Sequence, residues 1–182
     1  MKKILLASLL SISLASSLSA YELNGNLGVK WTGFKTIKKV PVSGTFNTIN
    51  LDIKSSASLS DFLTSANVII KSASFESKDS VRNENIISTL FALPSAEIIE
   101  GSILEVNEDE KSLILNVTMN EVTNPVKMDY TIENGNIVAI GNIDVLDFLM
   151  ENSFMDFAEK CSTYHENKSF SDVDIEFTIP YK

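Results

Sequence analysis

The chain of 182 residues has little of the chemistry that builds disulfide frameworks and most active sites. It contains one cysteine, Cys161, and one histidine, His165. A single cysteine excludes an intrachain disulfide, so the stability of the fold has to come from burial of apolar side chains. A single histidine leaves little for acid–base or nucleophilic catalysis, which most often depends on that residue.

The sequence also lacks the motifs of cofactor-dependent catalysis. It has no phosphate-binding glycine loop, no dinucleotide-binding glycine fingerprint, no paired cysteine motif and no serine in a recognisable triad context. Its carboxylates lie mainly at solvent-facing strand positions or in turns such as residues 108–110. We therefore expect a protein that is not an enzyme and has no cofactor.

Cys161 and His165 are the one pair that suggests a metal ion, because residues four apart on a helix share a face. Two ligands without a third or fourth nearby make a weak site, so we expect no metal. Cys161 follows a helical pattern that contains Phe154 and Phe157. A buried thiol that packs as a small apolar group is its expected role.

Basic charge is scarce, since 15 Lys and Arg stand against 24 Asp and Glu, for a net charge of −9. A chain this acidic repels nucleic acid and anionic membrane surfaces. Long hydrophobic runs are also missing. The best candidate, residues 4–14, is shorter than the roughly 18 apolar residues that a membrane span requires, and serines interrupt it.

This first segment has the pattern of a secretory signal peptide. Lys2 and Lys3 precede the apolar run, and small residues lead to Ser19 and Ala20. We expect cleavage after Ser19 or Ala20, which removes two lysines and no acid and moves the charge to −9 − 2 = −11. No cysteine lies near the cut, so we expect no lipid anchor and no stable membrane insertion. Residues 21–182 are expected to form a single domain.

Strand-like alternation is what the chain has in abundance. At residues 29–35 an apolar row shifts its phase at Gly33, which predicts a β-bulge or a barrel corner. The run at residues 66–75 is apolar on both sides, as in a strand that is covered on two faces. The other predicted strands lie at residues 40–46, 49–53, 96–106, 112–120, 126–132, 137–144 and 173–179.

Three helical segments interrupt the strands. Residues 60–65 suggest one helical turn, and residues 148–161 a longer helix with an apolar stripe. Residues 81–93 predict a third helix, with Asp79 or Ser80 as its N-cap and Pro94 as its stop. About eight strands of alternating polarity with short connections form either a sandwich or a closed barrel, and the alternation alone does not separate these two.

Several segments together resemble one family. They are VKWTGFKTIKKVPVSGTF at residues 29–46, SVRNEN at 80–85, VTMNEVTNPV at 117–126, GNID at 141–144, Cys161, and KSFSDV at 168–173. In their order and spacing they resemble the YceI-like family of bacterial secreted proteins. SVRNEN is similar to that family's Arg-Asp-x-His segment, but Asn83 and Asn85 stand where many relatives have Asp and His.

The resemblance implies a mainly β fold: an antiparallel, eight-stranded, lipocalin-like β-barrel with one or two helices packed outside or across it. It also implies a periplasmic protein that encloses a long-chain amphiphile, and it allows a homodimer. Ten phenylalanines, one tryptophan and five methionines would by themselves suggest only a core. With the resemblance, they predict a cavity for a polyisoprenoid, an isoprenoid quinone, a fatty acid or a fatty amide, held for transport, storage or stress protection.

We expect the lipid tail to enter first and to contact inward-facing side chains. These are Trp31, Phe34, Phe46, Phe75, Phe91, Val117, Met119, Met128, Tyr130, Phe148, Phe154 and Phe177. Arg82 and Asn83 are expected to meet the headgroup, because a helix N-terminus offers free N–H groups and positive potential.

Two alternatives stay open at this point. Arg82 could instead be a surface residue that pairs with Asp79 or Glu84. The whole barrel could also serve as a non-catalytic structural or protein-interaction module with a filled core. An eight-stranded barrel is narrow enough for side chains to fill its interior.

Overall fold

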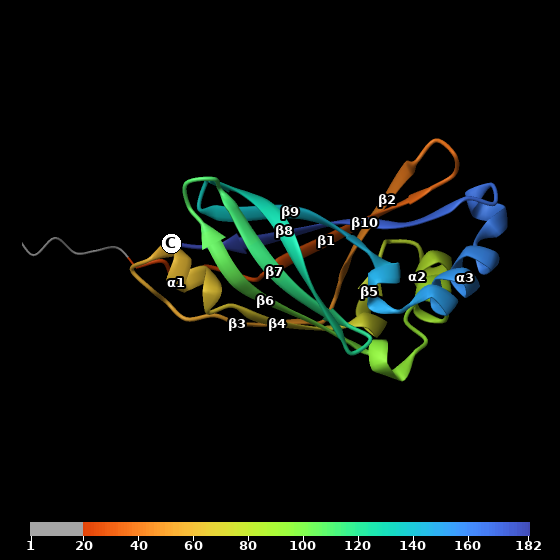
Figure 1. Ribbon diagram of the computed structural model, residues 1–182, viewed down its shortest axis with the longest axis horizontal. Coiled ribbons are helices and arrows are strands. Elements are labelled where there is room, and N and C mark those ends of the chain that lie inside the picture. The colour runs from red at the N-terminus through yellow and green to blue at the C-terminus, as the bar shows by residue number, and fades with distance from the viewer. Residues whose placement is uncertain (1–19) are drawn as a thin grey trace, which may run out of the picture.

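The computed structural model describes residues 20–182. The predicted signal peptide lies outside these residues except for Ala20, and it stays a prediction. Figure 1 shows that one curled sheet dominates the fold. Its ten strands within the described residues are β1 (Gly28–Lys35), β2 (Val40–Phe46), β3 (Ile49–Asp52), β4 (Asn67–Lys71), β5 (Phe75–Glu76), β6 (Ile98–Asn107), β7 (Ser112–Met119), β8 (Val122–Glu133), β9 (Asn136–Asp144) and β10 (Ser169–Pro180).

Neighbouring strands are antiparallel throughout, in the order β3-β4-β6-β7-β8-β9-β10-β1-β2-β5. The two ends of this order are joined by the chain itself, since β2 runs into β3 and β4 runs into β5. Backbone hydrogen bonds continue between these two bent segments. The Asn47 N–H donates to the Ser74 carbonyl at 2.8 Å, and the Lys71 N–H donates to the Thr48 carbonyl at 3.2 Å. The sheet therefore curls round on itself.

The antiparallel, barrel-like β fold expected from the sequence is confirmed, but the strand count is ten rather than eight. The run at residues 66–75, predicted as one strand, is broken by the 3₁₀ turn η1 (Ser72–Ser74). Serine hydroxyls take over the hydrogen bonds there: Ser72 donates to the Glu97 carbonyl at 3.1 Å, and Ser74 accepts from the Thr48 N–H at 2.9 Å. If β2–β3 and β4–β5 are each counted as one continuous bent strand, the number of strands is 10 − 2 = 8.

The predicted irregularity at Gly33 is also confirmed. The pairing of β1 with β10 shifts its register between Gly33 and Lys35. A bulge of this kind bends the strand and increases its twist. As a result, β1 can pair with β10 on one side and with β2 on the other while following the curve of the sheet.

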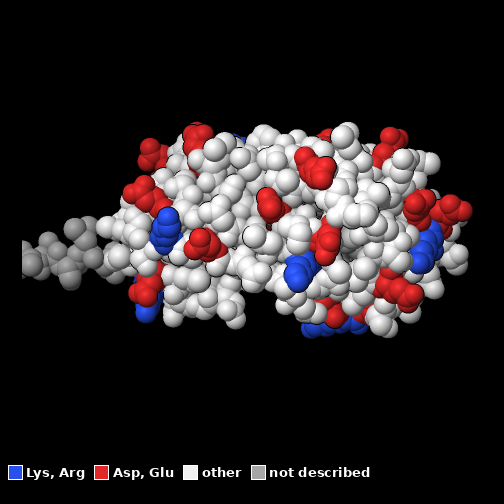
Figure 2. Space-filling model, turned by 90° about the horizontal axis from the view of Figure 1, so that it is seen from below, with Lys and Arg blue, Asp and Glu red and all other residues white. Residues whose placement is uncertain are grey.

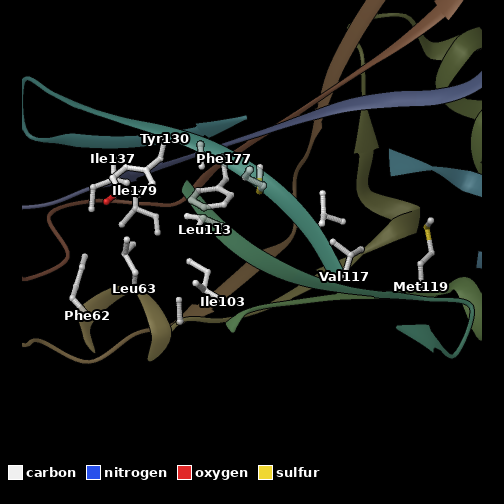
Figure 3. Close-up of a cluster of buried hydrophobic side chains, with 14 of the residues drawn as sticks. Phe62, Leu63, Ile103, Leu113, Val117, Met119, Tyr130, Ile137, Phe177 and Ile179 are labelled. Carbon is white, nitrogen blue, oxygen red and sulfur yellow. The ribbon is translucent and has the colours of Figure 1, made fainter. Parts of the chain in front are cut away.

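Helix α1 (Leu59–Thr64) closes one end of the barrel with a dense core. Ser58 caps this helix by accepting a hydrogen bond from the Asp61 N–H at 3.2 Å. Phe62 and Leu63 are completely buried, with 0% exposure. They pack with side chains from strands that are distant in sequence, among them Leu113, Ile137 and Ile179 (Figure 3). Burial of each large apolar side chain stabilises the fold by roughly 1.5–3 kcal/mol.

The other helices lie at the opposite end of the barrel (Figure 1). They are α2 (Ser80–Ile87) and α3 (Glu151–Lys160), with the 3₁₀ turns η2 (Pro94–Ala96), η3 (Val145–Phe148) and η4 (Ser162–His165) nearby in the sequence. Asp79 caps α2 as expected, but α2 ends at Ile87, well before Pro94. The hydroxyls of Ser88 and Thr89 each donate to a helix carbonyl at 2.6 Å, and such local bonds compete with further helical turns. No helix within residues 20–182 is long and apolar enough to cross a membrane.

Two strand glycines differ sharply in the space around them, and we therefore expect alanine to affect stability differently at the two positions. A Cβ at Gly44 would lie 2.5 Å from the Glu76 carbonyl oxygen and 2.7 Å from Cζ2 of Trp31, whereas a Cβ at Gly101 would meet nothing closer than 3.7 Å. We expect Gly44→Ala to lower the free energy of unfolding by roughly 1–3 kcal/mol, because the site is already full. Gly101→Ala should stay within about 0.5 kcal/mol of the parent. Urea unfolding followed by circular dichroism measures both, and equal losses for the two variants would contradict the packing described.

Candidate functional site

The barrel interior is filled at one end and hollow toward the other. A cavity of about 490 Å³ extends from the core at α1 to helices α2 and α3. In Figure 3, Val117 and Met119 lie apart from Phe62 and Leu63, on the side toward α2 and α3, and both line the cavity. This volume falls within the ~300–1,000 Å³ that is typical of small-molecule sites.

Four aromatic rings from separate segments form one wall of this cavity. Trp31 of β1 stacks on Phe75 of β5, with the ring centroids 4.4 Å apart and the planes at 29°. Phe46 of β2 meets Phe75 edge to face at 5.8 Å, and Phe91, beyond α2, lies 6.4 Å from Phe46 and 6.3 Å from Phe75. Aromatic pairs with such geometry contribute about 0.5–1.5 kcal/mol beyond their buried area. The wall is therefore held in shape without a ligand.

Most of the side chains predicted to bind a ligand do line the cavity. They are Trp31, Phe34, Phe46, Phe75, Arg82, Phe91, Val117, Met119, Met128, Phe154 and Phe177. Strand alternation places those that lie in strands, because alternate side chains of each strand face the interior of the curled sheet, and Arg82, Phe91 and Phe154 come from the helical end. The structure places them around one space, and their contact with a ligand stays a prediction.

Tyr130, Phe148 and Asn83 lie elsewhere. Tyr130 is 2% exposed and packs in the filled end beside Ile137, and its hydroxyl has no hydrogen-bond partner among the described residues (Figure 3). Phe148 of η3 is buried at the helical end, where its carbonyl accepts from Asn120 Nδ2 at 2.9 Å, but it does not line the cavity. Alternation correctly predicts which side chains face inward, but it does not say which end of a barrel is packed solid.

Asn83 has a structural role that its position in SVRNEN did not indicate. Its amide oxygen accepts from the Ser77 N–H at 2.9 Å and from the Ser77 hydroxyl at 2.7 Å. Its amide nitrogen donates to Glu76 Oε1 at 3.1 Å. Asn83 thus ties the start of α2 to β5 and does not face the cavity. This network holds the pKa of Glu76 below its ordinary value, chiefly through the bond from Asn83.

Polar side chains gather where the cavity meets the helices. Lys35 of β1, Arg82 and Asn85 of α2, and Tyr164 and His165 of η4 all line it there. Val81 and Tyr164 line the cavity and remain 53% and 61% exposed, so they mark an opening at this end. The sequence did not lead us to predict Lys35 as a residue of the cavity. The available signal was its position two residues after Gly33, in a row of inward-facing residues.

Arg82 has the predicted ion pair with Asp79 and also lines the cavity, and its contact with a headgroup stays a prediction. Its Nη2 forms an ion pair with Asp79 Oδ2 at 3.2 Å, and Nη1 donates to Ser77 Oγ at 3.3 Å. The pKa of the Asp79 carboxyl is lowered, first by the backbone N–H of Arg82 and, against some desolvation, by the charges of Arg82 and Lys35. The expected pairing with Asp79 therefore exists while Arg82 also lines the cavity.

Cys161 is buried at the same end, and burial raises its thiol pKa against the opposing effects of an Asn85 hydrogen bond and the charges of Lys160 and Lys35. A protonated thiol is a weak nucleophile. Within residues 20–182 no group of three or more His, Cys, Asp or Glu side chains is placed to hold a metal ion.

His165 lies beside Cys161 in a partly desolvated setting. Its Nδ1 is 2.7 Å from Ser169 Oγ, and its ring meets Phe157 edge to face at 5.6 Å. Burial lowers the pKa of His165, and the positive charges of Lys35 and Arg82 lower it further. The imidazole is therefore neutral at pH 7 and acts as a polar group without charge.

Comparison with known families and structures gives a consistent picture. A family model described as the YceI-like domain matches residues 17–180. A polyisoprenoid binding domain from Saccharophagus degradans, implicated in plant cell wall breakdown, superimposes with a TM-score of 0.61 at 14% identity, over 90% of this chain and 97% of that domain. No curated protein matches the chain by sequence.

Two further crystal structures share the fold. BcnA of Burkholderia cenocepacia has a TM-score of 0.58 at 15% identity, over 84% of this chain and 94% of its own. The YceI protein of Campylobacter jejuni has a TM-score of 0.55 at 11% identity, over 97% of this chain and 98% of its own. At such identities the similarity concerns the fold alone.

The lowered pKa of His165 predicts a pH dependence of stability. As the pH falls below about 6.5, the unfolded chain takes up the imidazole proton before the folded protein does. The free energy of unfolding should therefore decrease from about pH 6.5 down to the lowered pKa. His165→Gln should flatten this part of the profile, measured by urea unfolding at several pH values, while the carboxylate contribution at lower pH remains in both proteins. Because the chain has one histidine, NMR titration gives its pKa directly, and a midpoint at or above 6.5 would contradict this assignment.

Proposed function

Because the chain belongs to the YceI-like domain family, we propose that it is a binding protein that holds a long-chain amphiphilic lipid in its cavity. The observation that carries this proposal is the cavity of about 490 Å³ between the filled core and the helical end of the barrel. Its walls are aromatic and aliphatic, and its polar side chains gather near one opening. Such a space suits a ligand with an apolar tail and a polar head.

The energetics set a minimum length for that tail. Each buried methylene contributes ~0.8 kcal/mol, so about fifteen of them contribute roughly 12 kcal/mol before association costs. Those costs are at least about 4 kcal/mol, and a micromolar dissociation constant corresponds to about 8 kcal/mol. A tail of about fifteen carbons therefore reaches micromolar affinity without headgroup contacts.

Polyisoprenoids, isoprenoid quinones, fatty acids and fatty amides all meet this requirement. The description of the Saccharophagus domain as polyisoprenoid binding supports the first of these classes for a protein of the same fold. The tail lies along the aromatic wall of Trp31, Phe46, Phe75 and Phe91, and the headgroup stays at the opening between α2 and η4. The protein has no enzymatic role in this proposal.

The proposal includes secretion. The basic, apolar and small-residue order of residues 1–20 supports export to the periplasm, followed by cleavage of the signal peptide. There the protein carries, stores or sequesters its lipid, and nucleic acid is not a partner.

A cavity-filling variant tests the binding site. A Cβ at Gly101 meets Leu115 and Val68 at 3.7 Å, so a phenylalanine fits the backbone there and projects into the cavity. We expect the parent, purified from periplasm, to carry a stoichiometric lipid in native mass spectrometry, and Gly101→Phe to carry none while it keeps its fold by circular dichroism. Gly28→Phe is the matched control. Gly28 is an exposed glycine that does not line the cavity, and its Cβ would lie 3.5 Å from Thr178.

Two outcomes would overturn the proposal. The first is a bare mass for the parent that does not change after incubation with quinones, fatty acids and fatty amides, which would favour the interaction-module alternative. The second is a loss of roughly 1–3 kcal/mol in the stability of Gly101→Phe, the sign of an overpacked solid interior. The single tryptophan, Trp31, lines the cavity and gives an independent fluorescence signal of occupancy.

A further inference from the structure

The charged side chains of the cavity lining are unevenly distributed. Lys35, Asp79 and Arg82 lie at the helical end, where β1 stops and α2 begins. The two remaining acids in the lining, Glu100 and Glu176, belong to strands. Glu100 is exposed, and Glu176 pairs at 3.4 Å with exposed Lys30, so both carboxylates lie on the outer side of the wall. The helical end therefore holds two cations and one carboxylate.

Asp79 compensates only one of these two cations. It forms its ion pair with Arg82 at 3.2 Å, and its other oxygen accepts the Arg82 backbone N–H at 3.0 Å. Lys35, by contrast, has no ion pair and no side-chain hydrogen bond with any residue in the range 20–182. Lys35 is partly buried and lines the apolar space, so its ammonium group is free to pair with an anion at the cavity.

Arg82 also keeps hydrogen-bonding capacity for a ligand. The guanidinium has five N–H donors, and Asp79 and Ser77 occupy one Nη2 and one Nη1 position. The side chain is only partly exposed and lines the cavity. It can therefore donate to a second anion without breaking its existing ion pair.

The positive charge at the helical end contrasts with the negative net charge of the whole protein. The net charge of the chain is −9, and on the face in Figure 2 acidic side chains outnumber the basic ones. The charges of Lys35 and Arg82 act on their neighbours in the site, since both add to the effect of burial in lowering the pKa of His165. A neutral headgroup would leave the Lys35 ammonium uncompensated at the cavity.

We infer that the lipid bound in this cavity carries an anionic headgroup, a carboxylate or a phosphate, which Lys35 and Arg82 bind at the helical end. This inference rests on the proposed lipid-binding function and narrows it. It disfavours quinones, amides and neutral isoprenoids as the preferred ligands.

Three probes with the same sixteen-carbon chain test it: palmitate, hexadecyl phosphate and hexadecanol. Binding is measured at pH 7.5 by quenching of Trp31 fluorescence in delipidated protein. We expect at least one of the two anions to bind about tenfold more tightly than the alcohol, which corresponds to ~1.4 kcal/mol. Comparison of palmitate with hexadecyl phosphate then assigns the headgroup to a carboxylate or a phosphate.

Lys35→Met should lower the affinity for the preferred anion about tenfold and leave hexadecanol unchanged, because methionine keeps the length of the side chain without its charge. Lys35→Arg should restore most of the anion affinity. Lys30→Met is the matched control, since it removes the same charge from the same strand at an exposed position outside the cavity lining, and it should alter neither ligand.

The results separate the two claims. If none of the three probes binds, the lipid-binding function itself fails. If hexadecanol binds as tightly as both anions, or if Lys35→Met and Lys30→Met act alike, the anionic headgroup is refuted while the lipid-binding function stands.

Discussion

The fold depends on the hydrogen bonds between two bent strand segments, β2–β3 and β4–β5. β3 pairs with β4 at four positions and β2 pairs with β5 at two, while β2 also pairs with β1 and β4 with β6. Without these two segments, β1 and β6 would be open edges of the sheet, and the interior would be exposed to water. Backbone groups in the curled sheet satisfy one another along the strands, and at the break in the second segment the hydroxyls of Ser72 and Ser74 complete the hydrogen bonding.

Curling of the sheet creates an interior, and the chain fills only part of it. Phe62 and Leu63 of α1 pack one end to completion, together with residues from β7, β9 and β10. The helices at the other end cover the barrel without inserting equivalent side chains, so a cavity remains between Met119, Phe154 and the aromatic wall. A filled end supplies stability from apolar burial, which a chain without a disulfide requires, and it leaves the other end available to a ligand.

Three polar groups of the site come from the ends of elements. Lys35 ends β1, Arg82 lies in the first turn of α2, and His165 ends η4. Charged side chains at such positions keep contact with water while they border an apolar space. The site therefore combines an apolar interior with an opening bordered by positive charge, and neither part is formed by one segment of the chain.

The strands and their inward-facing side chains could be predicted from the sequence, because the alternation of polar and apolar residues is a local property of each strand. Alternation predicted the antiparallel β fold, the bulge at Gly33, and the inward direction of side chains such as Trp31, Val117 and Phe177. It also placed Tyr130 inside, correctly, but Tyr130 lies in the filled end and not at the cavity. The break at Ser72–Ser74 was missed because serine hydroxyls that replace ladder hydrogen bonds leave no trace in hydrophobic periodicity.

By itself the sequence determined which faces of the strands are apolar and where α1 and α2 begin, since these follow from neighbours within a few residues. The helix predicted at 148–161 begins only at Glu151, after the 3₁₀ turn η3 and the left-handed Leu149. Only the tertiary structure decided that one end of the barrel is solid and the other hollow, and that Lys35 and Arg82 meet at the same opening. Those features depend on the volumes and charges that strands distant in sequence bring to a shared space, and no local pattern records how such a space is filled.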